Sequence, residues 1–154
     1  MKGFQFKIDG NWAHFKKPET NNNPLSHDLI PKTALIGMIG AVLGIEREKM
    51  KSLFPQLSED LLYGVELLKP VKKASCGFTS HTAINPTAIK SPKAFEMLRD
   101  VSYKVCVGLN GERSQSIFDD FQNAILEGYA IYDPYLGIAN CPAELTFISH
   151  GEFT

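Results

Sequence analysis

The sequence has few cysteines and no spacing among them that would build a disulfide framework or a zinc site. Three cysteines occur in 154 residues, widely separated and without a paired-cysteine motif. Such usage is typical of reduced thiols in a cytoplasmic protein. The histidines His14, His27, His81 and His150 also lie far apart, without metal-ligand spacing. We therefore expect no metal and no cofactor.

Long apolar runs are missing as well. The longest, residues 34–45, contains three glycines and is too short to span a bilayer. The first seven residues alternate polar and apolar and lack the apolar core of a signal peptide. These features predict a cytoplasmic protein without a membrane partner.

Neither sign of charge is in excess. Lys and Arg number 16 against 17 Asp and Glu, for a net charge of -1, which excludes a uniformly basic protein that coats nucleic acid by bulk attraction. A local basic patch is still compatible with this value, because net charge averages over all faces. The 44% hydrophobic content and the length fit one globular domain, residues 1–154. No phosphate-binding loop, dinucleotide fingerprint, zinc-protease helix or nucleophile elbow is present.

Hydrophobic periodicity predicts an alternating order of strands and helices. Strands are expected where apolar residues alternate, and helices where they recur at helical spacing. The predicted strands are 4–8, 61–71, 101–109, 129–132 and 145–148, and the predicted helices are 32–43, 46–54 (ended by Pro55), 92–99 and 114–126, with an irregular loop at 72–92. This order is that of a split β-α-β unit, so we predict an α+β, ferredoxin-like (RNA-recognition-motif-like) antiparallel sheet with helices on one face.

The helix at 32–43 has one face made of small residues. Gly37, Gly40, Ala41 and Gly44 recur at helical spacing, although glycine costs about 1 kcal/mol relative to alanine inside a helix. Such a face implies that something approaches the helix backbone closely. We expect tight packing within the fold, with direct contact to a ligand as the alternative.

Positive charge is concentrated between residues 67 and 95, where no acidic residue occurs. This segment carries Lys69, Lys72, Lys73, Lys90 and Lys93. It also contains side chains able to bond phosphate or base edges, and an aromatic ring able to stack on a base: Thr79, Ser80, His81, Asn85 and Phe78. Further basic or hydroxyl groups, Lys16, Lys17, Lys32 and Thr33, flank the start of the first helix, where free backbone N–H groups attract anions. The segment alone would indicate a solvated basic loop; together with the helix start and the predicted fold it indicates single-stranded RNA.

Four stretches of the sequence resemble one protein family. The sequence is similar to the CRISPR-associated "Cas five" family at residues 13–18 (AHFKKP), 30–44 (IPKTALIGMIGAVLG), 133–143 (DPYLGIANCPA) and, more weakly, 95–103 (FEMLRDVSY). Within this family it most resembles the type I-B members. Many relatives continue beyond the stretch that matches 133–143, so this chain resembles a short member, a truncated one or a domain fragment.

The resemblance implies a non-catalytic, RNA-binding subunit of a type I interference (Cascade) complex that serves antiviral defence. Such a subunit binds the 5′ handle of the guide RNA (crRNA) and caps the backbone filament beside the large subunit. The partners it implies are the crRNA handle, the backbone subunit, the large subunit and, indirectly, target DNA. The family's thumb-like insertion falls at about residues 72–93, and by position in the matching motif Lys16, Lys17, Lys32 and Thr33 are further RNA-binding candidates.

Two alternatives stay open at this point. One branch of the family cuts precursor crRNA without metal, using a tyrosine, a lysine and a histidine. Here His81 and the lysines near it supply two of these residue types, but no Lys-His pair is adjacent and the first helix has no tyrosine. We therefore expect no catalytic residue. The second alternative is a ferredoxin-like protein-interaction module without RNA.

Overall fold

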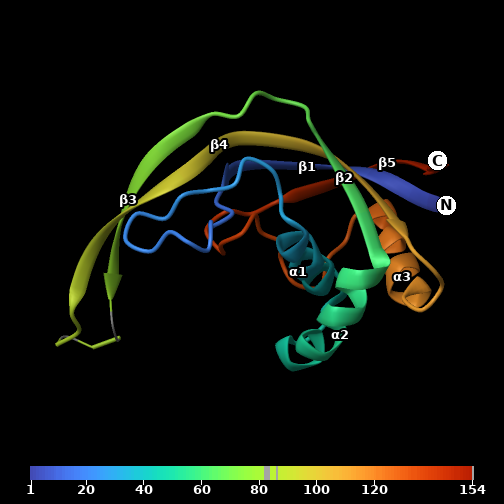
Figure 1. Ribbon diagram of the computed structural model, residues 1–154, viewed down its shortest axis with the longest axis horizontal. Helices are drawn as coiled ribbons and strands as arrows, with labels where there is room; N and C mark the ends of the chain where they lie inside the picture. Colours follow the sequence, from blue (N-terminus) through green and yellow to red (C-terminus); the bar gives the residue numbers. More distant parts are fainter. Residues whose placement is uncertain (82–83, 86, 154) are drawn as a thin grey trace.

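The computed structural model describes residues 1–81, 84, 85 and 87–153. Five strands and three helices follow one another along these residues (Figure 1). Their bounds are β1 (Lys2–Ala13), α1 (Lys32–Leu43), α2 (Arg47–Asp60), β2 (Leu61–Leu67), β3 (Lys73–His81), β4 (Lys90–Leu109), α3 (Gln115–Glu127) and β5 (Glu144–Glu152).

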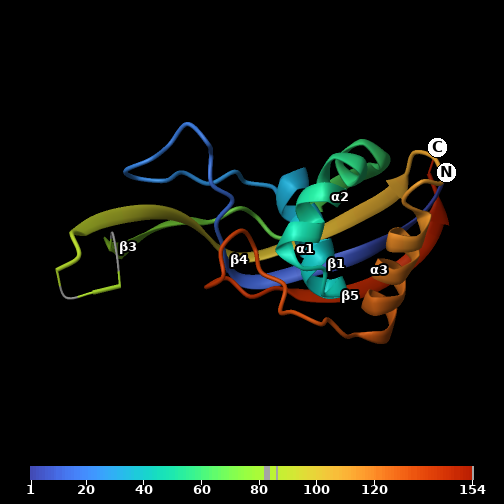
Figure 2. The ribbon, with the colours of Figure 1, turned by 90° about the horizontal axis from the view of Figure 1, so that it is seen from below.

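The strands form one antiparallel sheet in the order β2-β4-β1-β5. β4 is the longest strand, and its second half lies between β1 and β2. Residues 90–97 of its first half pair with β3 alone. β3 and β4 therefore extend from the sheet as a long hairpin, which is the elongated arm of Figures 1 and 2. Between the two halves, Asp100 has the positive φ of 51°, a conformation that aspartate tolerates better than most residues.

All three helices cover the same face of the curled sheet (Figures 1 and 2). Alternation decides which side chains meet them: Phe4, Phe6 and Ile8 of β1 are fully buried, and Phe6 contacts Phe121 of α3 with ring centroids 5.6 Å apart. The opposite face is polar, as expected of an antiparallel sheet with one wet side. There Asp9 accepts a hydrogen bond of 2.6 Å from Ser102 and pairs with Lys7 at 3.2 Å.

The strongly periodic elements were predicted correctly, including β1, α1, α3 and the second half of β4. The predicted basic loop and the predicted helix at 92–99 are wrong, because both lie in the β3–β4 hairpin. Alternation is present in β3, where Ala74, Cys76 and Phe78 are half-buried between exposed neighbours. Small and polar residues on both faces hide this alternation in the sequence.

Two further boundaries differ from the prediction. Pro55 lies inside α2 and does not end it, since the helix continues to Asp60, which is bonded to Arg113. Residues 129–132 form no strand; the N–H groups of Ile131 and Tyr132 donate to the carbonyl oxygens of Val42 and Ala41 at the end of α1. In the part of the chain that the structure describes, no helix is both long and apolar enough to cross a membrane.

Candidate functional site

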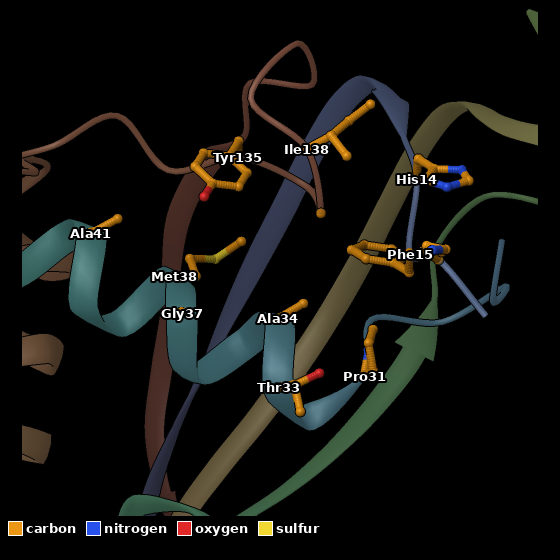
Figure 3. A pocket seen from close by; sticks show the side chains of 12 residues that line it. His14, Phe15, Pro31, Thr33, Ala34, Gly37, Met38, Ala41, Tyr135 and Ile138 are labelled. Carbon is orange, nitrogen blue, oxygen red and sulfur yellow. The ribbon is translucent and has the colours of Figure 1, made fainter. Parts of the chain in front are cut away.

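Three segments that are far apart in the sequence meet around one cavity of about 330 Å³ (Figure 3). The chain just after β1 contributes His14, Phe15 and Lys16, and the loop before β5 contributes Tyr135, Gly137 and Ile138. Pro31, just before α1, and one side of that helix complete the lining, with Thr33, Ala34, Gly37, Met38 and Ala41. The cavity is thus mostly apolar, with Lys16, Thr33, Tyr135 and His14 as its polar residues.

The small face of α1 has two different roles. Leu35, Ile36 and Ile39 are buried toward the sheet, so the opposite side of the helix is left for the cavity. A β-carbon on Gly40 would meet the sulfur of Met50 at 2.9 Å, which is the close packing that we expected. A β-carbon on Gly37 would meet nothing within 4 Å, so at this position the helix backbone lies open to the cavity.

The start of α1 is electrostatically suited to an anion. The residue before the helix, Pro31, makes no side-chain cap, and the first turn contains no acidic residue. The first N–H groups of a helix lack intrahelical partners and carry a partial positive charge. Since Pro31, Thr33 and Ala34 line the cavity, its rim beside Lys16 favours a negative group.

The loop before β5 is fixed onto the chain that follows β1. The N–H of His14 donates to the carbonyl oxygen of Leu136 at 3.1 Å, and the N–H of Leu136 donates to the carbonyl oxygen of Cys141 at 2.7 Å. Leu136 and Cys141 are completely buried, and burial raises the pKa of the Cys141 thiol to about 11. Cys141 therefore stays a neutral thiol at neutral pH, and its role here is packing.

His14 anchors the hairpin. Its side chain is 1% exposed, its Nδ1–H donates to the carbonyl oxygen of Glu96 at 2.7 Å, and its ring lies 5.1 Å from that of Phe95. Its Nε2 is buried without a hydrogen-bond partner among the described residues. Figure 3 shows the ring pointing away from Tyr135. The histidine lines the cavity, but its imidazole serves the base of the β3–β4 hairpin.

The structure separates the four predicted residues near the helix start. Lys16 and Thr33 are exposed and line the cavity. Lys32 instead donates at 2.5 Å to the carbonyl oxygen of Ser58 in the last turn of α2, a common position for a lysine near a helix C-terminus. Lys17 is half-buried, and its backbone pairs with Leu25.

The predicted basic residues between 67 and 95 lie on or beside the hairpin, apart from the cavity lining. Some of their charges are paired, although residues 67–95 themselves contain no acid. Lys73 pairs with Asp28 at 3.1 Å and with Glu96 at 3.4 Å, and the hydrogen bond to Asp28 raises the pKa of the Lys73 ammonium. Lys69 pairs with Asp100 at 2.9 Å. Lys72 is exposed and makes no ion pair with any residue that the structure describes.

The remaining predicted residues are arranged along the hairpin. Thr79, Ser80, His81 and Lys90 are exposed, and His81 lies opposite Lys90 where the pairing of β3 with β4 ends. Phe78 is half-buried, with its ring edge-on to Phe95 at 5.0 Å. The Asn85 carboxamide oxygen accepts bonds from the N–H and hydroxyl of Thr87 at 3.1 and 3.0 Å.

Sequence reasoning did not single out Tyr135, Met38 or Ile138 as site residues. The signal that could have found them is the glycine at 137, which has a φ of 89° and lies against the chain at His14. Gly137 lies between Tyr135 and Ile138, which line the cavity opposite α1. Among the described residues, no group of three or more His, Cys, Asp or Glu side chains is placed to hold a metal ion.

The fold and the three stretches that form the cavity define a CRISPR-associated protein. The model of the family described as CRISPR-associated protein (Cas_Cas5) matches residues 3–151, so the chain belongs to this family. The predicted "Cas five" membership is therefore confirmed. No curated protein matches the chain in sequence.

Chains from three solved CRISPR complexes have a similar fold. A chain of a "CRISPR RNA-guided surveillance complex" has a TM-score of 0.67 at 16% identity, over 90% of this chain and 58% of that one. A chain of a Type III-B Cmr-beta complex bound to cognate target RNA and AMPPnP has a TM-score of 0.57 at 11% identity, over 94% of this chain and 63% of that one. A chain of a "Type IV-B CRISPR Complex" has a TM-score of 0.50 at 12% identity, over 97% of this chain and 91% of that one. The chain thus has a mixed α/β fold, with a curled antiparallel sheet and three helices, and it spans 58% of the first of these chains.

Proposed function

We propose that this chain is a non-catalytic, RNA-binding subunit of a type I CRISPR interference (Cascade) complex, with type I-B as the subtype that the sequence favours. In this proposal it binds the 5′ handle of the crRNA and caps the backbone filament beside the large subunit. The subunit contacts target DNA only indirectly, as part of the assembled complex, and the complex serves antiviral defence.

One observation carries the proposal. The stretches 13–18, 30–44 and 133–143, which hold the family resemblance, converge on a single cavity that contains both Lys16 and Thr33. Core packing alone would give a filled contact at Gly37, whereas the helix backbone there is open. RNA-binding proteins commonly hold unstacked bases against apolar or aromatic surfaces and contact the phosphates with basic groups. An apolar cavity with a lysine and an uncapped helix start at its rim meets both needs.

The strand order supports a ferredoxin-like assignment. Without the hairpin, the order β2-β4-β1-β5 with helices after the first and third of these strands along the chain is the split β-α-β arrangement. We assign the β3–β4 hairpin to the thumb-like insertion. Its exposed Lys72, Thr79, Ser80, His81 and Lys90 are the groups that we propose for handle phosphates or bases.

The geometry of His14 favours a binding role over nuclease activity. Tyr135, Lys16 and His14 all line the cavity, and these are the three residue types that a metal-independent ribonuclease would use. A general base must reach the 2′-hydroxyl, directly or through water. In His14, Nδ1 is occupied by Glu96 and Nε2 is buried, so neither nitrogen can accept that proton without a rearrangement. Processing of precursor crRNA is the runner-up function.

The binding claim is tested by filling the cavity. Gly37→Leu places a side chain in the open space, and we expect it to weaken binding of a fluorescently labelled, repeat-derived crRNA by roughly fivefold to 150-fold, the range given by about 1–3 kcal/mol for one stacked base. Gly64→Leu is the matched control, because Gly64 is also without neighbours within 4 Å but lies in β2. Equal affinities of the two variants would show that the cavity is not the RNA site.

The non-catalytic claim has a separate test. The chain is incubated with its repeat RNA in a chelator, and the RNA is followed on a denaturing gel. We expect the RNA to stay intact. Cleavage that is lost in Tyr135→Phe or His81→Ala would replace our proposal with the runner-up.

A further inference from the structure

A second concave surface lies between α2 and α3, apart from the cavity described above. It is a groove of about 650 Å³ on the helical side of the molecule. Figure 1 shows α2 and α3 beneath the same face of the sheet. Apolar side chains form much of its lining: Leu43, Ile45, Leu53, Ile117, Tyr129 and Ile131.

Hydrogen bonds and ion pairs hold the walls of this α2–α3 groove together where α2 ends and α3 begins. Asp60, the last residue of α2, accepts bonds of 2.6 Å from both Arg113 and Ser114, which precede α3. Gln56 of α2 donates to the Ser114 hydroxyl at 3.0 Å. The spacing of the two helices is therefore fixed before any partner arrives.

The floor of the groove is also built in place. The N–H of Ile131 donates to the carbonyl oxygen of Val42 at 3.0 Å, and the Ile131 side chain packs so closely on Gly44 that a β-carbon there would meet its Cγ2 at 2.6 Å. Nevertheless Ile131 is 61% exposed and Tyr129 is 51% exposed. Rigidly held, exposed apolar side chains in a groove are typical of a surface that binds another protein.

Charge distinguishes this groove from the RNA-binding surface. After Arg113 the sequence contains six acidic residues and no Lys or Arg. Two of the acids, Asp120 and Glu127, lie on the α3 wall, are exposed and make no ion pair among the described residues. Lys49 lies on the α2 wall, so the groove lining has one more negative than positive side chain, and its acids are confined to α3. Phosphate groups would be repelled at the α3 wall, whereas Lys and Arg side chains would be attracted to it.

We propose that the α2–α3 groove binds an amphipathic helix of a protein partner. The apolar face of that helix would cover Leu53, Ile117 and Ile131, and Lys or Arg residues at its margin would pair with Asp120 and Glu127. A helix is the expected form because both walls are helices and the described part of the groove offers no strand edge to extend. This inference is independent of RNA binding at the cavity.

The first experiment uses a defined probe on the full chain. A helical peptide of leucine and lysine is titrated into the ¹⁵N-labelled protein and followed by NMR, with a twin peptide carrying glutamate in place of lysine. We expect shifts confined to the groove residues for the lysine peptide and no binding of the glutamate twin. Equal binding of both peptides, or shifts centred on another surface, would overturn the proposal.

Adjacent aspartates on α3 supply a matched control. Asp120 lines the α2–α3 groove, whereas Asp119 lines a different hollow, beside the chain termini. Asp120→Lys should weaken the lysine peptide about tenfold, which is about 1.4 kcal/mol, and Asp119→Lys should leave it unchanged. Both variants should bind crRNA like the wild type. If the two substitutions weaken the peptide equally, net charge and not the groove is responsible.

The natural partner is read out by cross-linking. A photo-reactive amino acid replaces Asn123, which lines the groove, or Asp119, in chain co-expressed with the other subunits of its CRISPR complex. We expect a cross-link from position 123 to a helical segment rich in both apolar and basic residues. A complex that assembles without a cross-link at 123, or a cross-linked segment that is acidic, would contradict the inference.

Discussion

The α-carbon of Gly137 lies so close to the carbonyl oxygen of His14 that a β-carbon at position 137 would overlap this oxygen. The two residues are joined through the neighbouring hydrogen bond from the His14 N–H to Leu136. This approach positions Tyr135 and Ile138 opposite α1, and it therefore creates the cavity. It also connects the cavity to the hairpin, because the same histidine bonds to Glu96.

Gly137→Ala is expected to destabilise the fold strongly. The residue has a φ of 89°, and left-handed backbone costs a residue with a β-carbon about 1–2 kcal/mol. Displacing the chain at His14 adds about 1–3 kcal/mol of overpacking. The expected loss, about 3 kcal/mol, can be measured by urea unfolding followed through Trp12.

Gly128 is the control for this prediction. It has a similar φ of 75°, but a β-carbon there would meet nothing within 4 Å. Gly128→Ala should thus show only the backbone cost, about 1 kcal/mol. Losses of equal size in the two alanine variants would show that the contact with His14 has no energetic role.

Gly37→Ala should stabilise the protein, in contrast to most core substitutions. Position 37 is inside α1, where alanine is favoured over glycine by about 1 kcal/mol, and the added methyl group meets no neighbour within 4 Å. In Gly40→Ala the same gain is opposed by the contact with Met50 at 2.9 Å. Thermal unfolding of both variants should rank Gly37→Ala above Gly40→Ala; the reverse order would mean that Gly37 is not open.

Local patterns determined which elements could be predicted. Strong alternation in β1 and in residues 101–109, and an apolar stripe in α3, are properties of short stretches, and all three elements formed as expected. The β3–β4 hairpin was missed because its stability depends on partners far away in the sequence. Glu96 bonds to Ser26 and Pro24, and Phe95 packs on His14.

The candidate site shows the same limit. Lys16 and Thr33 were predicted from a motif, and both line the cavity. Tyr135 was not predicted, because only the tertiary fold brings residue 135 to residue 33. The absence of acids near Lys73 in the sequence did not mean that its charge is unpaired. Its partner Asp28 is 45 residues away along the chain, but the two charged groups are 3.1 Å apart in space.

Lys72 and Lys73 should therefore respond differently to substitution. Lys72→Ala removes an unpaired, exposed charge, so we expect weaker crRNA binding and a reduction of about one in the slope of log affinity against log salt. Lys73→Ala removes the partner of Asp28 and Glu96 and should mainly increase amide hydrogen exchange at the base of the hairpin. Identical salt slopes for the wild type and Lys72→Ala would exclude Lys72 from the RNA contact.

The ion pair that closes the α2–α3 groove should make stability depend on pH in the acidic range. Hydrogen bonds from Arg113 and then Ser114 lower the pKa of Asp60 below its ordinary value. A carboxylate whose pKa is lower in the folded state adds stability that is fully present above its unfolded pKa, about 4, and is lost as the pH falls through the folded value. In Asp60→Asn this contribution is absent. Urea midpoints of wild type and variant should thus differ most near neutral pH and converge below about pH 4.

Asp120→Asn, which changes an exposed carboxylate without an ion pair, is the control and should follow the wild type throughout. A gap between wild type and Asp60→Asn that stays constant down to about pH 3 would show that Asp60 stabilises the end of α2 by shape alone and not by its charge.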